Sequence, residues 1–137
     1  MNEQENVKIV EQAYSNFKSG DIPSLLNLVA DGIDWQLPIV ESVPFTGKRR
    51  GREAVKQFFA SVAEHQEVLQ FEPREFIAQG NKVVALGHYE WRVKGTGREV
   101  KSDFAHVFTV EGGRITVFQE YFDSAAFAAG YQKAISA

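Results

Sequence analysis

The spacing of apolar residues changes near residue 70, and this change constrains the fold more than any other feature of the sequence. Before that point apolar residues recur every three or four positions, which is typical of amphipathic helices. After it they alternate with polar residues, as in β-strands, and turns at 80–81, 95–97 and 112–113 divide the alternating part into four segments. Helices followed by an antiparallel sheet predict an α+β domain whose sheet buries one face against the helices.

The first part of the chain predicts three helices. Residues 7–17 carry apolar side chains at helical spacing. A second helix begins at the capping residue Asp21, carries its buried stripe to residue 29 and ends at residues 31–32. The third helix has the clearest pattern and covers residues 55–65.

The alternating part predicts a meander of long strands. Its strands cover residues 72–79, 82–93, 98–111 and 114–122. A short strand over residues 33–37 precedes the meander, and a loop over residues 39–51 follows that short strand. Asp123 or Ser124 caps a short final helix that continues through Phe127.

The composition limits the classes of function. With 137 residues, 44% of them hydrophobic, residues 1–137 are expected to form one domain with its own core. A net charge of −3 disfavours nucleic acid as a partner. The chain has no cysteine and 3 histidines, so we expect no metal site, although His88 and Glu90 have a ligand-like spacing. The absence of a signal-peptide pattern and of a long apolar run predicts a cytoplasmic protein without a membrane partner.

Alternation also sorts the residues of the strands onto two faces. One face is rich in aromatic residues and holds Ala85, Gly87, Tyr89, Trp91, Ser102, Phe104, His106, Phe108, Thr116, Phe118, Glu120 and Phe122. The other face holds Val84, Leu86, His88, Ala105, Val107, Thr109, Val117, Gln119 and Tyr121. This second face is too apolar to remain in water over three adjacent strands, so we expect a second copy of the chain to cover it.

Several pieces of the sequence follow one another in a characteristic order. They are the run from Tyr14 to Asp21, the Leu-rich second helix ending at Ala30 and Asp31, the strand ending at Pro38, and residues 51–59, 106–108, 113–115 and 120–123. This order, which covers nearly the whole chain, resembles the SnoaL-like branch of the NTF2-like superfamily. The resemblance implies a cone of curved sheet closed by three helices, a hydrophobic pocket for a small molecule inside it, and a homodimer through the outer sheet face.

The superfamily hosts isomerases, cyclases, dehydratases, epoxide hydrolases and adaptors, so the fold alone does not assign the chemistry. The base, oxyanion tyrosine and protonated aspartate of ketosteroid isomerase would fall on Leu37, Ala13 and His106, and these side chains exclude that mechanism. Limonene-epoxide hydrolases need an Asp-Arg-Asp set, which Arg92 on the outer face does not complete. The resemblance to SnoaL-type polyketide cyclases implies a histidine and an acid/base residue at His106 and Glu120, with Glu replacing the usual Asp.

His106 and Glu120 are therefore the predicted catalytic pair. They face inward on adjacent strands among aromatic residues, which suits proton transfer at carbon without a metal or cofactor. The predicted ligand-binding residues are Trp35, Leu37, Phe58, Phe59, Tyr89, Trp91, Ser102, Phe104 and Phe118. Together these residues predict an isomerase, cyclase or dehydratase that acts on an apolar, ring-bearing carbonyl compound.

Other interpretations fit the same sequence. His106 can be a core histidine bonded to a backbone carbonyl, and a one-residue shift of register would turn Glu120 to solvent. The protein would then be a non-catalytic ligand-binding protein, or a dimeric interaction module whose own Phe side chains fill the pocket. The basic run over residues 48–52 either holds an anion at the start of a helix or is solvated beside acidic residues such as Glu53.

Overall fold

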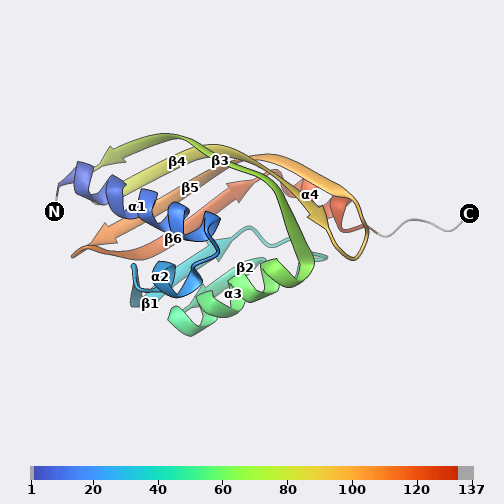
Figure 1. Ribbon diagram of the computed structural model, residues 1–137, viewed down its shortest axis with the longest axis horizontal. Coiled ribbons are helices and arrows are strands. Elements are labelled where there is room, and N and C mark those ends of the chain that lie inside the picture. Colours follow the sequence, from blue (N-terminus) through green and yellow to red (C-terminus); the bar gives the residue numbers. More distant parts are fainter. Residues whose placement is uncertain (1, 133–137) are drawn as a thin grey trace, which may run out of the picture.

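A six-stranded sheet forms the frame of the computed structural model, which describes residues 2–132. The strands, ordered β2-β1-β6-β5-β4-β3, are β1 (Val29–Leu37), β2 (Gly47–Arg50), β3 (Gln66–Gln79), β4 (Lys82–Val93), β5 (Glu99–Glu111) and β6 (Arg114–Phe122). The helices are α1 (Glu3–Lys18), α2 (Ile22–Leu26), α3 (Arg52–His65) and α4 (Ser124–Gly130). The sheet is curved, and α1, α2 and α3 lie against its concave side, which confirms the predicted α+β cone (Figure 1).

Neighbouring strands pair antiparallel except at one place. β3, β4, β5 and β6 form the predicted antiparallel meander, and β2 runs antiparallel to β1. β1 runs parallel to β6, with Trp35 beside Phe118, so the sheet is mixed rather than wholly antiparallel as predicted. β3 also carries two register shifts, and such bulges bend a strand, which helps the sheet to curve around the helices.

The helices begin at capping residues and close the concave face. Asn2, Asp21 and Asp123 each accept a hydrogen bond from a backbone N–H three residues further on, as predicted for Asp21 and Asp123. α1 contacts β3, β4 and β6, whereas α3 contacts β1, β2 and β3. The two helices therefore cover different parts of the sheet. Within residues 2–132, no helix is long and apolar enough to cross a membrane.

Two predicted segments are wrong, and both errors involve β1. The second helix ends at Leu26 instead of continuing to residues 31–32, because Val29 opens β1 and pairs with Ile115 of β6. Residues 47–50, predicted as part of a loop, form β2 along the end of β1. β3 also begins before its predicted start. The other elements match their predicted ranges more closely, and β4 and β6 have the predicted bounds.

The predicted assignment of the central strands to two faces is confirmed with one exception. His106 on β5 lies directly opposite Glu120 on β6, and both side chains are buried. A register shift after Thr109 takes Thr116 out of the inward-facing set. Ile115 replaces it and is 1% exposed. Because a bulge adds one residue to a strand, the alternation changes phase there.

Gly87 lies opposite Phe104 on the concave face of the sheet. A methyl group at position 87 would overlap the backbone oxygen of Glu72 and the ring of Phe104. The Phe104 ring stacks in turn on His106, with ring centroids 4.1 Å apart. The missing side chain of Gly87 therefore allows Phe104 to lie where it supports the imidazole.

We expect Gly87→Ala to lower the free energy of unfolding by about 1–3 kcal/mol, because the added methyl group overpacks a closed layer. Gly95→Ala is the matched control, since nothing lies within 4 Å of a methyl group added there. Its free energy of unfolding should stay within about 0.5 kcal/mol of the parent protein. Urea unfolding followed by circular dichroism measures both variants, and equal stability of the two would contradict the close packing at Gly87.

Candidate functional site

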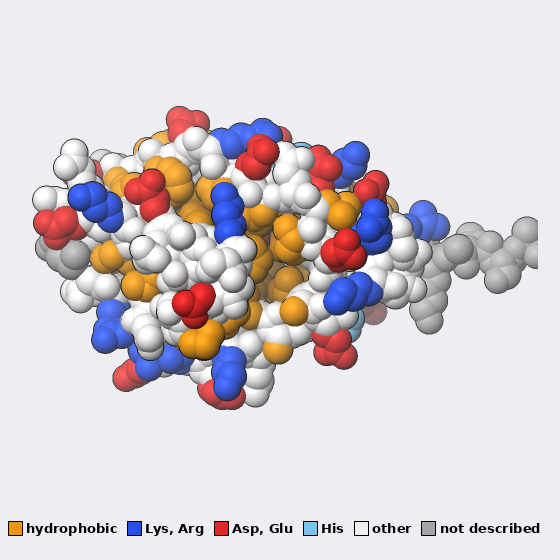
Figure 2. All heavy atoms as spheres, viewed as in Figure 1, with side chains coloured by type: hydrophobic (Ala, Val, Ile, Leu, Met, Phe, Trp, Pro, Cys, Tyr) orange, Lys and Arg blue, Asp and Glu red, His pale blue; other side chains and the backbone are white. Residues whose placement is uncertain are grey.

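A cavity of about 80 Å³ lies between the concave face of the sheet and the helices. Its walls are almost entirely apolar, and their residues come from all four helices and from β1, β3, β4, β5 and β6. In the view of Figure 2 the molecule is hollowed near its centre, and hydrophobic side chains form the floor of the hollow between charged groups. The cavity is therefore an apolar site within reach of solvent.

Most of the predicted site residues meet in this cavity. His106 and Glu120 line it together with Trp35, Leu37, Phe58, Phe59, Tyr89, Trp91 and Phe118. Ser102 and Phe104 are not among the lining residues. The Ser102 hydroxyl donates to the Asp103 carbonyl and accepts the N–H of Asp123, so its role is to join β5 to the start of α4. Phe104 lies behind the wall, between Gly87 and His106.

His106 and Glu120 face each other from adjacent strands. Nε2 of His106 lies 3.0 Å from Oε2 of Glu120, and the two side chains are only 6% and 9% exposed. The Nε2–H bond does not point at the carboxylate, so within the described residues Nε2 makes no directed hydrogen bond. The pair is thus close enough to interact as an ion pair, and Nε2 is left without a directed hydrogen bond among the described residues.

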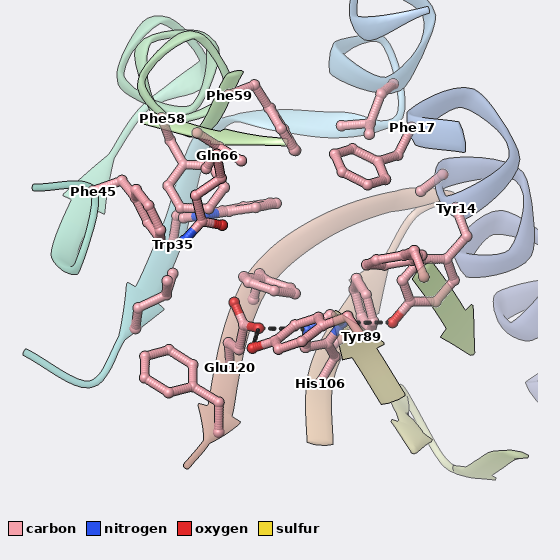
Figure 3. Close-up of a pocket in the computed structure, with 18 of the residues that line it drawn as sticks. Tyr14, Phe17, Trp35, Phe45, Phe58, Phe59, Gln66, Tyr89, His106 and Glu120 are labelled. Atoms are coloured by element: carbon pink, nitrogen blue, oxygen red, sulfur yellow. Dashed lines mark hydrogen bonds and ion pairs between the residues drawn. The ribbon is translucent and has the colours of Figure 1, made fainter. Parts of the chain in front are cut away.

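Two tyrosines extend this pair into a chain of four polar side chains, which we call the polar chain (Figure 3). The Tyr14 hydroxyl lies 2.7 Å from Nδ1 of His106, and the Tyr89 hydroxyl donates to Oε2 of Glu120 over 2.7 Å. Burial raises the pKa of both phenols well above 10.0, and the neighbouring charge of Glu120 adds to the effect. Both phenols stay protonated at neutral pH. When Tyr14 donates to Nδ1, a neutral imidazole carries its proton on Nε2.

Aromatic rings fix the orientation of the imidazole. Phe104 stacks on His106 with centroids 4.1 Å apart, and Phe118 packs edge-on at 4.9 Å. In such a low-dielectric site, hydrogen bonds and charge interactions are stronger than in water, and an unpaired charge is costly. The polar chain is therefore a fixed set of donors and acceptors that can give a proton to a bound molecule or take one from it.

Several residues of the cavity were not identified from the sequence. Tyr14 is the most important, because the helical spacing of α1 identifies it only as a buried position. Ala13, where the register placed the oxyanion tyrosine of ketosteroid isomerase, lines the cavity without a polar side chain. Gln66 at the start of β3 donates to the Tyr131 hydroxyl over 2.8 Å and links that strand to the end of α4. Phe127 of α4 completes this side of the wall.

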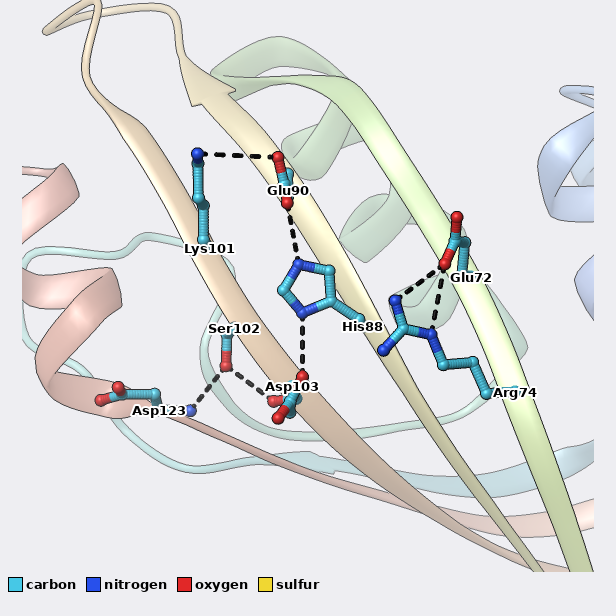
Figure 4. Close-up of polar contacts among 8 residues, drawn as sticks. All are labelled: Glu72, Arg74, His88, Glu90, Lys101, Ser102, Asp103 and Asp123. Atoms are coloured by element: carbon cyan, nitrogen blue, oxygen red, sulfur yellow. Dashed lines mark hydrogen bonds and ion pairs between the residues drawn. The ribbon is translucent and has the colours of Figure 1, made fainter.

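A second cluster of polar side chains lies on the outer face of the sheet (Figure 4). Nδ1 of His88 lies 2.9 Å from Asp103, and its Nε2 lies 2.9 Å from Glu90. Lys101 lies 4.0 Å from the other oxygen of Glu90, and Glu72 faces His88 from β3. Two carboxylates thus hold the two nitrogens of one imidazole. In the described part of the chain, no group of His, Cys, Asp and Glu is arranged to hold a metal ion.

The basic run over residues 48–52 is partly neutralised by ion pairs. Arg50 Nε lies 3.0 Å from Asp34, and Arg52 lies 2.8 Å from Asp31. These pairs favour the interpretation of the run as a solvated edge of the sheet over that of an anion site.

The curved sheet, its covering helices and the enclosed cavity define a pocket protein of the NTF2-like class. Residues 10–118 match the family described as SnoaL-like domain, and the chain belongs to this family. No protein of curated function matches the sequence.

Solved structures show the same fold. An NTF2-like protein from Burkholderia xenovorans LB400 is 34% identical, with a TM-score of 0.89 over 96% of this chain and 99% of its own. An NTF2-like protein of unknown function from Burkholderia pseudomallei K96243 is 28% identical, with a TM-score of 0.82 over 94% and 97% of the two chains. TerC, co-crystallised with polyporic acid, is 27% identical, with a TM-score of 0.81 over 93% and 98%.

The cluster around His88 predicts a pH-dependent stability. The hydrogen bonds that His88 donates to Glu90 and then to Asp103 raise the pKa of His88 above its ordinary value of 6.5. Because the folded pKa lies above the unfolded one, the stabilisation is fully present below pH 6.5 and is lost as the pH rises through the folded pKa. We therefore expect His88→Gln to be less stable than the parent at about pH 5.5, with a smaller difference at about pH 8.5.

Urea unfolding at the two pH values measures this difference. His65→Gln is the control, because among residues 2–132 the ring of His65 hydrogen-bonds only to Ser61 and pairs with no carboxylate. A loss of stability in His88→Gln that is the same at both pH values would contradict a charged His88 in the folded protein.

Proposed function

We propose that this protein is an acid/base enzyme that transfers protons at a carbon atom next to a carbonyl group, in a small ligand with an apolar ring. The observation that carries the proposal is the polar chain, whose four side chains lie in a cavity with otherwise apolar walls. Buried polar groups cost free energy unless they are paired. Tyr14 and Tyr89 pair two of them, and Nε2 of His106 is left to reach a ligand.

Glu120 is the base in the proposed reaction. It takes a proton from the carbon next to the carbonyl, the C–H electron pair forms a C=C bond, and the carbonyl oxygen becomes an enolate oxygen. His106 donates its Nε2–H to that oxygen and stabilises the charge where it develops. The Tyr89 hydroxyl holds Oε2 of Glu120, so Oε1 is the oxygen that accepts the proton.

Tyr14 is a positioning residue in this reaction. Its hydroxyl lies on Nδ1 and thereby keeps the imidazole proton on Nε2, which faces the ligand. The proton held by Glu120 returns to a different carbon in an isomerisation. In a cyclisation the enolate carbon attacks a second carbonyl, whose oxygen takes the proton held by Glu120. In a dehydration the β-hydroxyl takes that proton and leaves as water while the enolate electrons form the C=C bond and restore the carbonyl. These steps need hydrogen-bond donors and a base and use no redox chemistry.

The size of the cavity and one relative support a small ligand. The volume of about 80 Å³ is below the roughly 300–1,000 Å³ of sites that take drug-sized molecules, so the cavity suits a small ligand. TerC, to which the chain is similar, was co-crystallised with polyporic acid.

A non-catalytic ligand-binding protein is the second candidate. The almost wholly apolar walls favour it, because they can hold a ring without any chemistry. The alternative of an interaction module with a filled pocket is less favoured, since a cavity remains between Trp35, Trp91 and His106.

We further infer that a second copy of the chain covers the outer face of the sheet. Half-buried apolar residues form the centre of this face, namely Val84, Leu86, Ala105, Val107 and Val117. Ile77 and Tyr121 beside them are 50% and 52% exposed. In a two-fold dimer this patch meets itself, and an apolar centre avoids contacts between like charges.

We expect Glu120→Gln to lower the rate of proton transfer by about 100-fold or more, because the amide cannot accept the proton. Deuterium exchange at the carbons next to the carbonyl of 2-indanone, followed by NMR in D2O, measures this rate without knowledge of the natural substrate. Glu90→Gln removes a carboxylate of the outer face and is the matched control, with an unchanged rate expected.

Equal exchange rates in the parent and in Glu120→Gln would overturn the proposed role of Glu120. Saturable binding of 2-indanone by the parent without exchange above the buffer rate would favour the non-catalytic binding protein.

The proposed dimer is tested by a charge at the centre of the outer face. Val107→Lys should give a monomer in size-exclusion chromatography with light scattering, because two lysines would then face the apolar patch of the partner. Ile39→Lys is the control, since Ile39 is 81% exposed in the loop after β1. A parent protein that is already monomeric at micromolar concentration would refute the dimer.

A further inference from the structure

Two tryptophans that line the cavity each carry a buried indole N–H without a hydrogen-bond partner among residues 2–132. Trp35 and Trp91 both line the cavity, and each residue is 5% exposed. Within residues 2–132, neither indole Nε1 has an acceptor. Buried indole N–H groups in proteins normally find a partner, because leaving a buried donor unsatisfied costs free energy. An unsatisfied donor on a residue that lines a ligand cavity can be satisfied by an acceptor of a ligand that displaces the side chains covering it.

The two indoles approach the polar chain from different sides. Trp35 on β1 stacks on Phe118 with centroids 4.0 Å apart, and Phe118 packs against His106. Trp91 on β4 packs against Tyr89 at 5.4 Å, and Tyr89 is bonded to Glu120.

The strand order β1-β6-β5-β4 places the catalytic pair between these two tryptophans along the concave face. Figure 3 shows Trp35 across the cavity from Tyr14, on the far side of Glu120 and His106. A ligand that reaches both indoles therefore spans the catalytic pair.

We propose that the indole N–H groups of Trp35 and Trp91 bind oxygen acceptors of the ligand on either side of the carbon on which Glu120 acts. The ligand class is then a ring with at least two oxygen acceptors, such as a diketone or a hydroxyketone, and not a ring with a single polar group. This inference rests on the proposed function and adds the residues that select the ligand.

Selection in this arrangement comes from the donors that a wrong ligand leaves unpaired. A hydrocarbon ring of the right shape fills the apolar walls but covers both N–H groups without bonding them. A ring with acceptors at the matching places satisfies them, and sites of this kind discriminate strongly because the unmatched ligand leaves buried donors unsatisfied. The apolar walls supply affinity, and the indoles supply discrimination.

NMR tests the assignment directly, since the chain contains only 2 tryptophans and each gives one indole N–H signal. The probes are 1,3-indandione, which has two carbonyl oxygens, and indane, which has the same ring skeleton without oxygen. With 1,3-indandione we expect both indole proton signals to move downfield, and with indane we expect no downfield movement. A shift confined to one indole would overturn the two-sided assignment.

Substitution gives an independent measurement. Trp35→Phe and Trp91→Phe should each weaken binding of 1,3-indandione about five- to tenfold, the value of one hydrogen bond, and change indane binding less than about twofold. Phe59→Leu is the control, because it alters the shape of the cavity without removing a donor and should affect both probes alike. If a tryptophan variant fails to fold, the signals of the parent protein decide.

The inference and the proposed function fail in different ways. Bound 1,3-indandione that leaves both indole signals in place overturns the inference, even while Glu120-dependent exchange of 2-indanone persists. If the parent protein shows the indole shifts but exchanges 2-indanone no faster than buffer, the proposed enzyme is overturned and a selective binding site remains.

Discussion

The pairing of β5 with β6 is the constraint on which the rest of the site depends. It places His106 opposite Glu120 at a depth where a carboxylate is costly unless it is hydrogen-bonded. Tyr14 from α1 and Tyr89 from β4 provide the compensating bonds, so one helix and three strands meet at a single pair. A shift of either strand by one residue would turn its polar group to the other face and break the arrangement. Fold and site are therefore specified by the same register.

Much of this register could be predicted from the sequence. Alternation divides the residues of each strand into two sets, one for each face of the sheet. The set that is rich in aromatic residues is the one on the buried face. Glycine turns delimit β4, β5 and β6 closely enough that alternation alone assigns His106 and Glu120 to one face. Helical spacing likewise placed Phe58 and Phe59 on the wall of the cavity.

The features that escaped prediction depend on contacts between distant segments. Residues 47–50 have no strand pattern of their own and form β2 because the end of β1 is there to pair with. The bulge after Thr109, which exchanges Thr116 for Ile115, is likewise a property of two strands together. Tyr14 carries no local signal that its hydroxyl meets a histidine 92 positions away in the sequence. Local patterns thus predict which face of the sheet a residue lies on, whereas long-range pairing determines which residue it contacts.

The contact between Gly87 and Phe104 makes the sheet side of the cavity intolerant of substitution. The helical side formed by α1 and α3 contains no glycine with such a close contact. The backbone oxygen of Glu72 and the ring of Phe104 leave no room there for a side chain, and Phe104 supports His106 from behind. The opposite wall is helical, and Phe17 and Phe59 meet each other there through side chains alone. Evolution or redesign toward new ligands can therefore proceed by substitutions on α1 and α3, with the strands kept as they are. The helices are thus the half of this protein that can change its ligand, and the sheet is the half that holds the reacting groups.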